Sequence, residues 1–366
     1  MNQRVDTYLA SAAVNSTART YASAWRRFTA WCEETGRIAL PATAHTVIRY
    51  LTAASETSIA TSTLEVWRAA IARIHVEAGL LDPTADPTFR REWRALRRSH
   101  SRVHAEETAD AVPAVTVPMI TAMVQTAHEQ ARTWRQQVAA RRDIALLLLM
   151  YDAGRRRSEI AELTIGDLDI VTGSEALLRI RMRNNQTRDP DTHYIYRPRG
   201  TSSGLTCPWC ALARWLDVVS TCDSAVSAAH TRCFDDAAVT DAASIAVQRL
   251  LRRDTSDPHE HRCTTAWIRG RLRAPLFRPL SHGGLPHFDT PLTARSTARV
   301  ITARASAAGL GALPTHSLRA GVVTHLLDTG TGVDDIMALT GHKRAETILR
   351  YDRRRAQPGS NAPTGL

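Results

Sequence analysis

The sequence contains almost no lysine. Lys343 is the only lysine among 47 basic residues, so a mechanism that needs a lysine side chain has a single candidate. Long apolar runs are missing too. The strongest, Ile144 to Met150, is too short to cross a bilayer and is flanked by arginines, which favours a buried helix. The first residues also lack the basic and then apolar layout of a secretory signal. We therefore expect a cytoplasmic protein with no membrane partner.

The charge balance of the chain is strongly basic. The formal net charge is +11 and the pI is about 10, while hydrophobic residues make up 43% of the 366 residues. That hydrophobic content indicates a folded protein, and the length allows two domains of ordinary size. The charge favours a polyanionic partner, with nucleic acid ahead of an anionic membrane.

The first hundred residues have helical periodicity. Tyr21, Trp25, Phe28 and Cys32 share one face of a predicted helix that ends at Gly36. A second helix, with apolar residues from Leu64 to Ile74, is predicted to end at Gly79. Over residues 1–105 we count 14 arginines against 9 acidic residues. We expect this region to form a helical DNA-binding domain.

A third helical stretch after Pro87 is unusually rich in arginine. Arginines on a helix are most often a solvated surface, but their density here favours contact with phosphates. The predicted DNA-binding residues are Arg90, Arg91, Arg94, Arg97 and Arg98.

The remaining chain divides at composition changes. Two prolines and a short acidic run predict an interdomain linker at 106–118, followed by a second domain at 119–355. Alternation of apolar residues with arginines from Leu178 to Arg183 predicts a β-hairpin with one arginine-rich face. Residues from about 218 to 273, rich in Ala, Asp, Ser and Thr, suggest a loose insertion, and 356–366 a disordered tail. The fold class is mainly α with a small antiparallel β element (α+β).

Three short motifs suit chemistry on a phosphodiester. Cleavage without a metal needs a nucleophile, cationic groups for the nonbridging oxygens and a proton donor for the leaving oxygen. Arginine offers two parallel charge-assisted hydrogen bonds, and histidine transfers protons near neutral pH. The motifs are "GRRRSEIAEL", "HSLRAG" and "GHKRAETILRY". Taken singly each is weak, because His316 could cap a helix and Tyr351 could simply pack beside Ile348.

Together and in this order, the motifs resemble those of the tyrosine recombinase (phage integrase) family. The resemblance places Arg156 and Arg319 on the nonbridging oxygens and Tyr351 as the nucleophile that forms a 3′-phosphotyrosyl link. It gives His316 the role of proton acceptor or phosphate ligand, and His342 that of a hydrogen-bond donor to the phosphate. It also implies a SAM-like core-binding domain at 1–105 ahead of the catalytic domain. The implied partners are double-stranded DNA carrying specific recombination sites and a homotetramer of the chain, with no ATP or cofactor.

One departure from the family concerns the general acid. The family places a lysine in the β-hairpin to protonate the leaving 5′-oxygen, whereas this hairpin has none. Arg183 or Arg188 could supply positive charge there, although a pKa above about 12 makes arginine a poor proton donor. We favour slower cleavage with an arginine in that place. Donation by another group, and a DNA-binding accessory protein that cuts poorly, remain alternatives, as does a type IB topoisomerase-like activity.

The six cysteines are more typical of free thiols or metal ligands than of disulfides in a cytosolic protein. Cys207 and Cys210 form a Cys-x-x-Cys pair, with further cysteines and histidines downstream. A structural zinc site on Cys207, Cys210, Cys233 and Cys263 is possible, with His259 or His261 as alternative ligands. The spacing fits no standard zinc finger, and we expect no metal.

Overall fold

The computed structural model describes residues 3–10, 16–57, 59–107, 113–173, 175–182, 193–200, 203–232, 236–263, 270–314 and 316–352. The chain divides into two compact units, residues 1–111 and 112–366. Within the described residues, no helix combines the length and apolar character needed to span a bilayer. The structure is mostly helical with one small antiparallel sheet, which confirms the predicted fold class.

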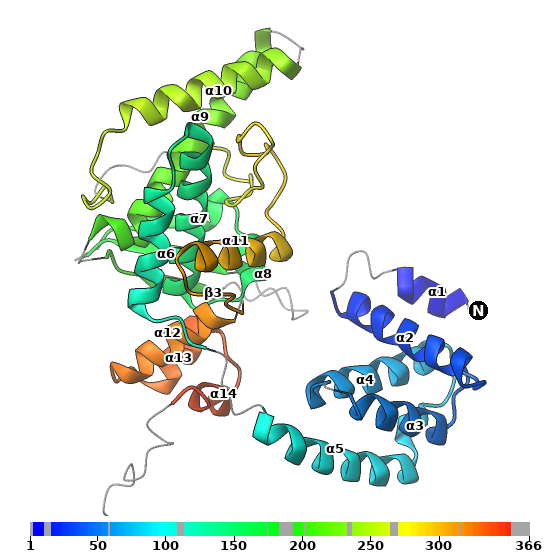
Figure 1. The fold of residues 1–366 in the computed structure, drawn as a ribbon. Helices are drawn as coiled ribbons and strands as arrows, with labels where there is room; N and C mark the ends of the chain where they lie inside the picture. Colours follow the sequence, from blue (N-terminus) through cyan, green and yellow to red (C-terminus); the bar gives the residue numbers. More distant parts are fainter. Residues whose placement is uncertain are drawn as a thin grey trace, which may run out of the picture. The chain divides into compact units, whose positions relative to one another are not determined.

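The N-terminal unit is entirely helical in its described residues. Trp25, Phe28 and Cys32 lie in its core, as the periodicity predicts, while Tyr21 is only half-buried. Gly36 and Gly79 follow the ends of their helices with φ of 63° and 75°, the left-handed conformation common after a helix. The helices are α1 (Gln3–Ala10), α2 (Ser16–Glu34), α3 (Ala44–Ser55), α4 (Thr61–Glu77) and α5 (Pro87–Glu107) (Figure 1).

The C-terminal unit is built around α7 (Trp134–Ala153), whose residues 144–150 are all buried, as expected for the apolar run. The last residues of α5 and the first of α6 fall inside the segment that the sequence assigned to a linker. The other helices of this unit are α6 (Val117–Glu129), α8 (Arg157–Ala161), α9 (Pro208–Arg232), α10 (Asp236–Arg253), α11 (Ala294–Ala307), α12 (Ser317–Asp328), α13 (Val333–Thr340) and α14 (Ala345–Leu349) (Figure 1).

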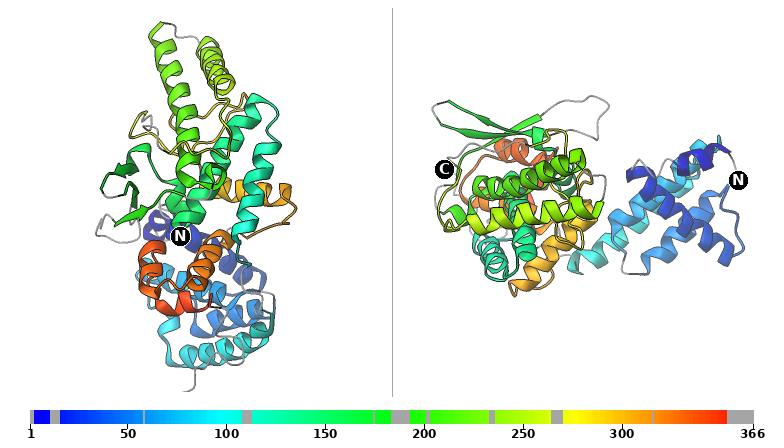
Figure 2. Two further views of the ribbon diagram at one scale, coloured as in Figure 1. Left: turned by 90° about the vertical axis from the view of Figure 1, so that its left-hand side faces the viewer. Right: turned by 90° about the horizontal axis from the view of Figure 1, so that it is seen from above.

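The sheet has three antiparallel strands in the order β1 (Leu168–Val171), β2 (Leu177–Met182) and β3 (His193–Arg197). It lies along one side of the helical body of this unit (Figure 2). Alternate residues of β2 face the core, as the sequence predicts. The sequence did not predict β1. This strand and the turn before it place acidic side chains next to the arginines of β2. Arg179 pairs with Asp169 of β1 at 2.6 Å and Arg181 with Asp167, just before β1, at 2.7 Å, so part of that charge is neutralised by neighbouring carboxylates.

The segment expected to be a loose insertion is ordered helix over most of its length. Residues 218–232 continue α9, and α10 packs along it as the second arm of a helical hairpin (Figure 1). Val239, Ala243 and Val247 of α10 are buried against α9. The expectation of a loose segment was wrong because alanines at helical spacing give a hydrophobic face that composition alone does not reveal.

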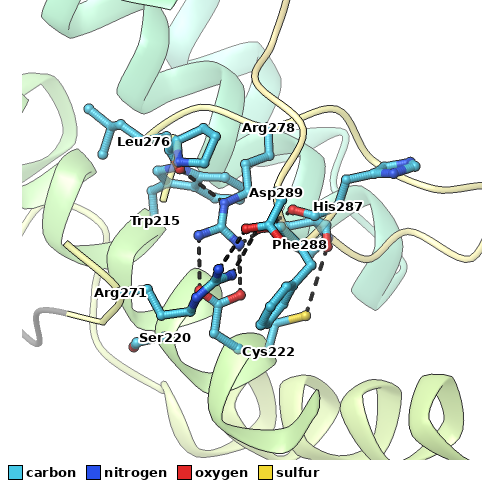
Figure 3. A network of polar contacts seen from close by, with 12 residues as sticks. Trp215, Ser220, Cys222, Arg271, Leu276, Arg278, His287, Phe288 and Asp289 are labelled. Carbon is cyan, nitrogen blue, oxygen red and sulfur yellow. Dashed lines mark hydrogen bonds and ion pairs between the residues drawn. The ribbon is translucent and has the colours of Figure 1, made fainter. Parts of the chain in front are cut away.

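A buried ion pair fastens α9 to the chain that follows the helical hairpin. Arg278 is fully buried and donates two hydrogen bonds to the carboxylate of Asp223, at 2.7 and 2.9 Å. It also donates to the carbonyls of Pro275 and His287 (Figure 3). Because the charge is both paired and hydrogen-bonded, burying it is tolerated. In its described residues, this region forms two isolated β-bridges, Thr164 to Pro275 and Leu280 to Pro286. Thr293 caps the start of α11, where its side chain accepts from the backbone N–H of Ser296.

Candidate active site

Two close contacts between turns bring the distant sequence motifs together. Gly154 ends α7 with φ of 59°, and a Cβ atom there would lie 2.8 Å from Thr340 and 2.9 Å from Val322. Gly341 ends α13 with φ of 74°, and a Cβ atom there would lie 2.4 Å from Nη1 of Arg155. Both positions therefore require glycine twice over, for the left-handed backbone and for the space. These contacts hold the "GRRR" turn against the "GH" turn.

Arg319 is the most buried of the predicted phosphate ligands, with 7% of its surface exposed. Its Nη1 donates to the carbonyl oxygens of Gly154 at 3.0 Å and Thr340 at 2.7 Å, and its Nε donates to Nε2 of His342 at 3.2 Å. Within the described part of the chain, Nη2 makes no hydrogen bond. The guanidinium is thus fixed on one edge and keeps a pair of N–H donors for a ligand.

His342 is held by a chain of hydrogen bonds that defines its tautomer. Thr340 donates its hydroxyl proton to the carbonyl of Ile336 at 2.6 Å, so it accepts from Nδ1–H of His342 at 2.7 Å. Nε2 then carries the lone pair that accepts from Arg319. Burial first, and then the charge of Arg319, lower the pKa of His342 to about 4. The ring is neutral at physiological pH and serves here as an acceptor.

Arg156 and His316 form the more open side of the same group. Arg156 precedes α8 and donates to Glu159 at 3.1 Å, so Glu159 orients this arginine. His316 precedes α12, where its side chain makes no capping bond. Partial burial, followed by the charges of Arg157 and Arg319, lowers the pKa of this histidine. We call Arg156, His316, Arg319 and His342 the arginine–histidine cluster.

Mutual repulsion of cations is the main electrostatic feature of this cluster. The pKa of Arg319 falls to about 10, chiefly through burial and then through the charge of Arg156. The charge of Glu159 opposes that fall but does not cancel it. Positive charges brought together in a partly dry site favour an anion between them.

Tyr351 lies two residues after the end of α14, where its backbone N–H donates to the carbonyl of Ile348. Its ring packs on a small core made by Val322, Val323, Leu327, Ile336 and Ile348. The structural alternative offered by the sequence, that Tyr351 packs beside Ile348, therefore holds for the ring. The phenol also lies within electrostatic reach of Arg319, since a charge on Tyr351 would raise the pKa of that guanidinium. Packing of the ring on this core is compatible with an electrostatic interaction between the phenol and Arg319.

The predicted substitutes for the lysine, Arg183 and Arg188, lie outside the described residues. The base of the hairpin is described, and there His193 donates from Nε2 to the carbonyl of Ala338 at 3.0 Å. The same carbonyl accepts from Nη2 of Arg155 at 3.2 Å. The hairpin is thus attached to α13, three residues before Gly341. Neither His193 nor the supporting role of Arg155 and Thr340 was predicted, because the contacts join segments far apart in sequence.

The arginine-rich stretch of the N-terminal unit forms a helix, α5, as the sequence predicts. Phe89 and Trp93 of α5 are buried, and all five predicted DNA-binding arginines are exposed on the rest of the helix. Arg97 is engaged by Glu65 at 3.0 Å. The exposed surface of α5 is therefore strongly cationic.

Three of the four proposed zinc ligands come together at the start of α9. Cys207, Cys210 and Cys263 are joined there by His261, which the sequence offered as an alternative ligand. Cys233 lies outside the described residues. We call Cys207, Cys210, His261 and Cys263 the cysteine–histidine cluster.

Comparison with known proteins identifies the architecture. A search against models of protein families gives no match. An integrase/recombinase XerD homolog from Selenomonas ruminantium is 23% identical over 344 residues, covering 92% of this chain and 81% of the relative. The pre-cleavage and post-cleavage complexes of the XerH site-specific recombinase with difH DNA superpose with TM-scores of 0.52 and 0.51, at 11% identity. Each alignment covers 93% of this chain and 77% of XerH.

The fold is that of a tyrosine recombinase. The resemblance inferred from the motifs is thereby confirmed. In this recombinase fold, the motif residues Arg156, Arg319, His342 and Tyr351 are gathered by helix ends and turns.

Proposed function

We propose that the chain is a site-specific recombinase that cleaves and rejoins DNA through Tyr351. The phenolic oxygen attacks the scissile phosphorus and its proton passes to a base, for which His316 is the candidate that the motifs supply. A 3′-phosphotyrosyl link forms as the bond between phosphorus and the 5′-oxygen breaks, and the leaving 5′-oxygen takes up a proton to become a 5′-hydroxyl. A 5′-hydroxyl from a partner strand reverses these steps. The convergence of Arg156, His316, Arg319 and His342 with Tyr351 supports this proposal most directly.

Arg319 would bind a nonbridging oxygen through Nη2, and Arg156 would do so after exchanging Glu159 for the phosphate. A bidentate guanidinium contact suits the developing charge of the transition state. His342 starts as a neutral acceptor from Arg319, so it can donate to phosphate only after gaining a proton at Nε2. A bound phosphate favours that protonated form, because it introduces an anion beside the ring.

The arginines of α5 would bind the DNA backbone, without reading sequence. Changing Arg91 and Arg98 to Gln should weaken binding to all duplexes and lower the slope of log affinity against log salt by about 0.9 for each phosphate that is no longer neutralised. Arg73→Gln is the matched control, because Glu77 already neutralises this arginine on α4. An unchanged slope in the double variant would remove α5 from the DNA interface. We further propose that four copies of the chain act together on two recombination sites, in the cytoplasm where the DNA lies.

Trapping the covalent intermediate tests the reaction itself. Nicked duplexes that cover the DNA flanking the gene lose a short fragment on cleavage, which prevents religation. The wild type should give an adduct that survives denaturing electrophoresis, and Tyr351→Phe should give none while still binding the duplex. Tyr196→Phe is a control at an exposed tyrosine of β3 and should leave the adduct unchanged. Wild type that binds its own site without forming an adduct would reject enzymatic cleavage.

That outcome would favour the second candidate function, a DNA-binding accessory protein on the same fold. The hairpin without lysine is the observation that favours it. A substrate whose leaving 5′-oxygen is replaced by sulfur separates weak acid catalysis from a dead site, because a thiolate leaves without needing a proton. Rescue of Arg183→Ala, Arg188→Ala or His193→Ala by that substrate would identify the proton donor. A topoisomerase-like activity would instead relax a plasmid that carries no recombination site.

A further inference from the structure

The cysteine–histidine cluster is far from the arginine–histidine motifs in sequence and has no part in the proposed reaction. Cys207 and Cys210 lie at the start of α9, and His261 and Cys263 lie in the loop that follows α10. The four ligand atoms all lie within 4.8 Å of one another. The three cysteines are at most 3% exposed.

The separations within the cluster are close to those of a tetrahedral zinc site. Nδ1 of His261 lies 3.5 Å from Sγ of Cys210 and 3.6 Å from Sγ of Cys263. Zinc bonds of about 2.3 Å to sulfur and about 2.0 Å to nitrogen at tetrahedral angles require sulfur–nitrogen edges of about 3.5 Å. An ion could therefore be accommodated with little movement of these atoms.

The surrounding residues hold the ligand loop in place. The backbone N–H of Arg262 donates to Sγ of Cys210 at 3.2 Å, a bond that orients a metal thiolate. Gly204 donates its N–H to the carbonyl of His259 at 2.8 Å. Buried Arg214 donates to the carbonyls of Asp257, Pro258 and Glu260. The loop between His259 and Cys263 is thus fixed by contacts from α9 and from the turn before it.

A redox function for the Cys-x-x-Cys pair does not fit the burial. Catalytic dithiols need a solvent-accessible attacking thiolate, whereas Cys207 and Cys210 are both 0% exposed. Three thiolates and one imidazole arranged around a point suit zinc, which prefers tetrahedral sulfur and nitrogen ligands. With four protein ligands no position stays open for substrate, so the site is structural.

We propose that Cys207, Cys210, His261 and Cys263 bind one zinc ion that ties the start of α9 to the loop after α10. The ion closes the base of the α9–α10 hairpin and fixes the chain leaving β3. This proposal does not rest on the recombinase activity, since zinc binding can be measured without DNA.

Elemental analysis of the purified full chain, kept reduced and away from chelating resins, tests the proposal. We expect one zinc per chain, and loss of most of it in Cys263→Ser and His261→Ala. His261→Cys should retain zinc, because it preserves four ligands. His259→Ala and Cys222→Ser are matched controls, a neighbouring histidine and a buried cysteine outside the cluster, and should also retain it.

Cobalt substitution gives a second readout that does not depend on how the protein was expressed. The wild type should give the intense visible bands of tetrahedral thiolate coordination, and His261→Ala should weaken or shift them. Two results would overturn the proposal. One is wild-type protein without zinc that also binds no added zinc or cobalt. The other is a Cys207–Cys210 disulfide found by mass spectrometry in the folded chain.

Discussion

The arginine–histidine cluster and the cysteine–histidine cluster are built for charges of opposite sign. The first presents N–H donors and repelling cations, whereas the second presents lone pairs of sulfur and nitrogen. They also differ in what holds them before a ligand arrives. Arg319 is already fixed by the carbonyls of Gly154 and Thr340. The three thiols and the imidazole of the second cluster would be held most strongly by bonds to a metal ion. Ligand removal should therefore affect function at one cluster and stability at the other.

The largest effect is expected from Arg319→Ala. Loss of a charged donor to the transition state should slow adduct formation by about 10²–10³-fold, as removal of one oxyanion donor does. The measurement is the single-turnover rate of adduct formation, normalised to folded protein. Arg304→Ala is the control, because it removes an ion pair with Asp143 away from the cluster. Equal losses in both variants would mean that Arg319 acts only through the fold.

Zinc removal should lower stability while leaving the rate of adduct formation almost unchanged. Chelation should lower the free energy of unfolding by about 3 kcal/mol, the contribution of a ligand present well above its Kd. Tm should fall by roughly 6–12 °C. The adduct rate of protein that remains folded should change little, because in the described residues no hydrogen bond joins a residue of the cysteine–histidine cluster to Arg156 or Arg319. The thermal transition of His261→Ala should not respond to the chelator, and a response there would place the metal elsewhere.

A smaller effect is expected where the two motif turns touch. Gly341→Ala places a methyl group 2.4 Å from Arg155 on a backbone with φ of 74°, which should cost about 1–3 kcal/mol of stability. Gly330→Ala is the matched control, since its φ is 83° but nothing lies within 4 Å of the added atom. Urea unfolding should rank Gly341→Ala below Gly330→Ala. Equal stabilities would show that Arg155 moves aside freely.

Local sequence patterns predicted the parts of the molecule that depend on neighbouring residues. The faces of α2 and β2 follow from periodicity, and the membership of Arg319 and His342 in one site follows from motif order. Strand β1 was missed because its four residues are too few to show a period. The α9–α10 hairpin was read as loose because alanine-rich helices look like linker composition.

The contacts that complete both clusters could not be predicted, because each joins segments more than twenty residues apart or depends on side-chain direction. Thr340 fixes the tautomer of His342, and Arg155 fills the space beside Gly341. His261 was an open alternative, and only the loop geometry places its Nδ1 beside Cys210. A pattern can supply a set of candidate ligands, but not the point at which they meet.

The smallest expected effect is the contribution of His342 to the pH dependence of stability. In the unfolded chain this ring titrates near 6.5, and in the folded protein near 4, chiefly because it is buried. Between those values the unfolded chain binds the extra proton, so the free energy of unfolding falls as pH falls from 6.5 towards 4.

His342→Gln removes that contribution and should lose about 1 kcal/mol less stability than the wild type between about pH 7 and pH 5, a figure reduced for solvent screening. Urea unfolding at the two pH values gives the comparison. Part of the slope should persist in the variant, because burial also lowers the pKa of His75 and His128. Identical slopes would mean that burial and the neighbouring arginines do not hold His342 neutral. A short DNA duplex should narrow the difference, because a phosphate beside the ring favours its protonated form.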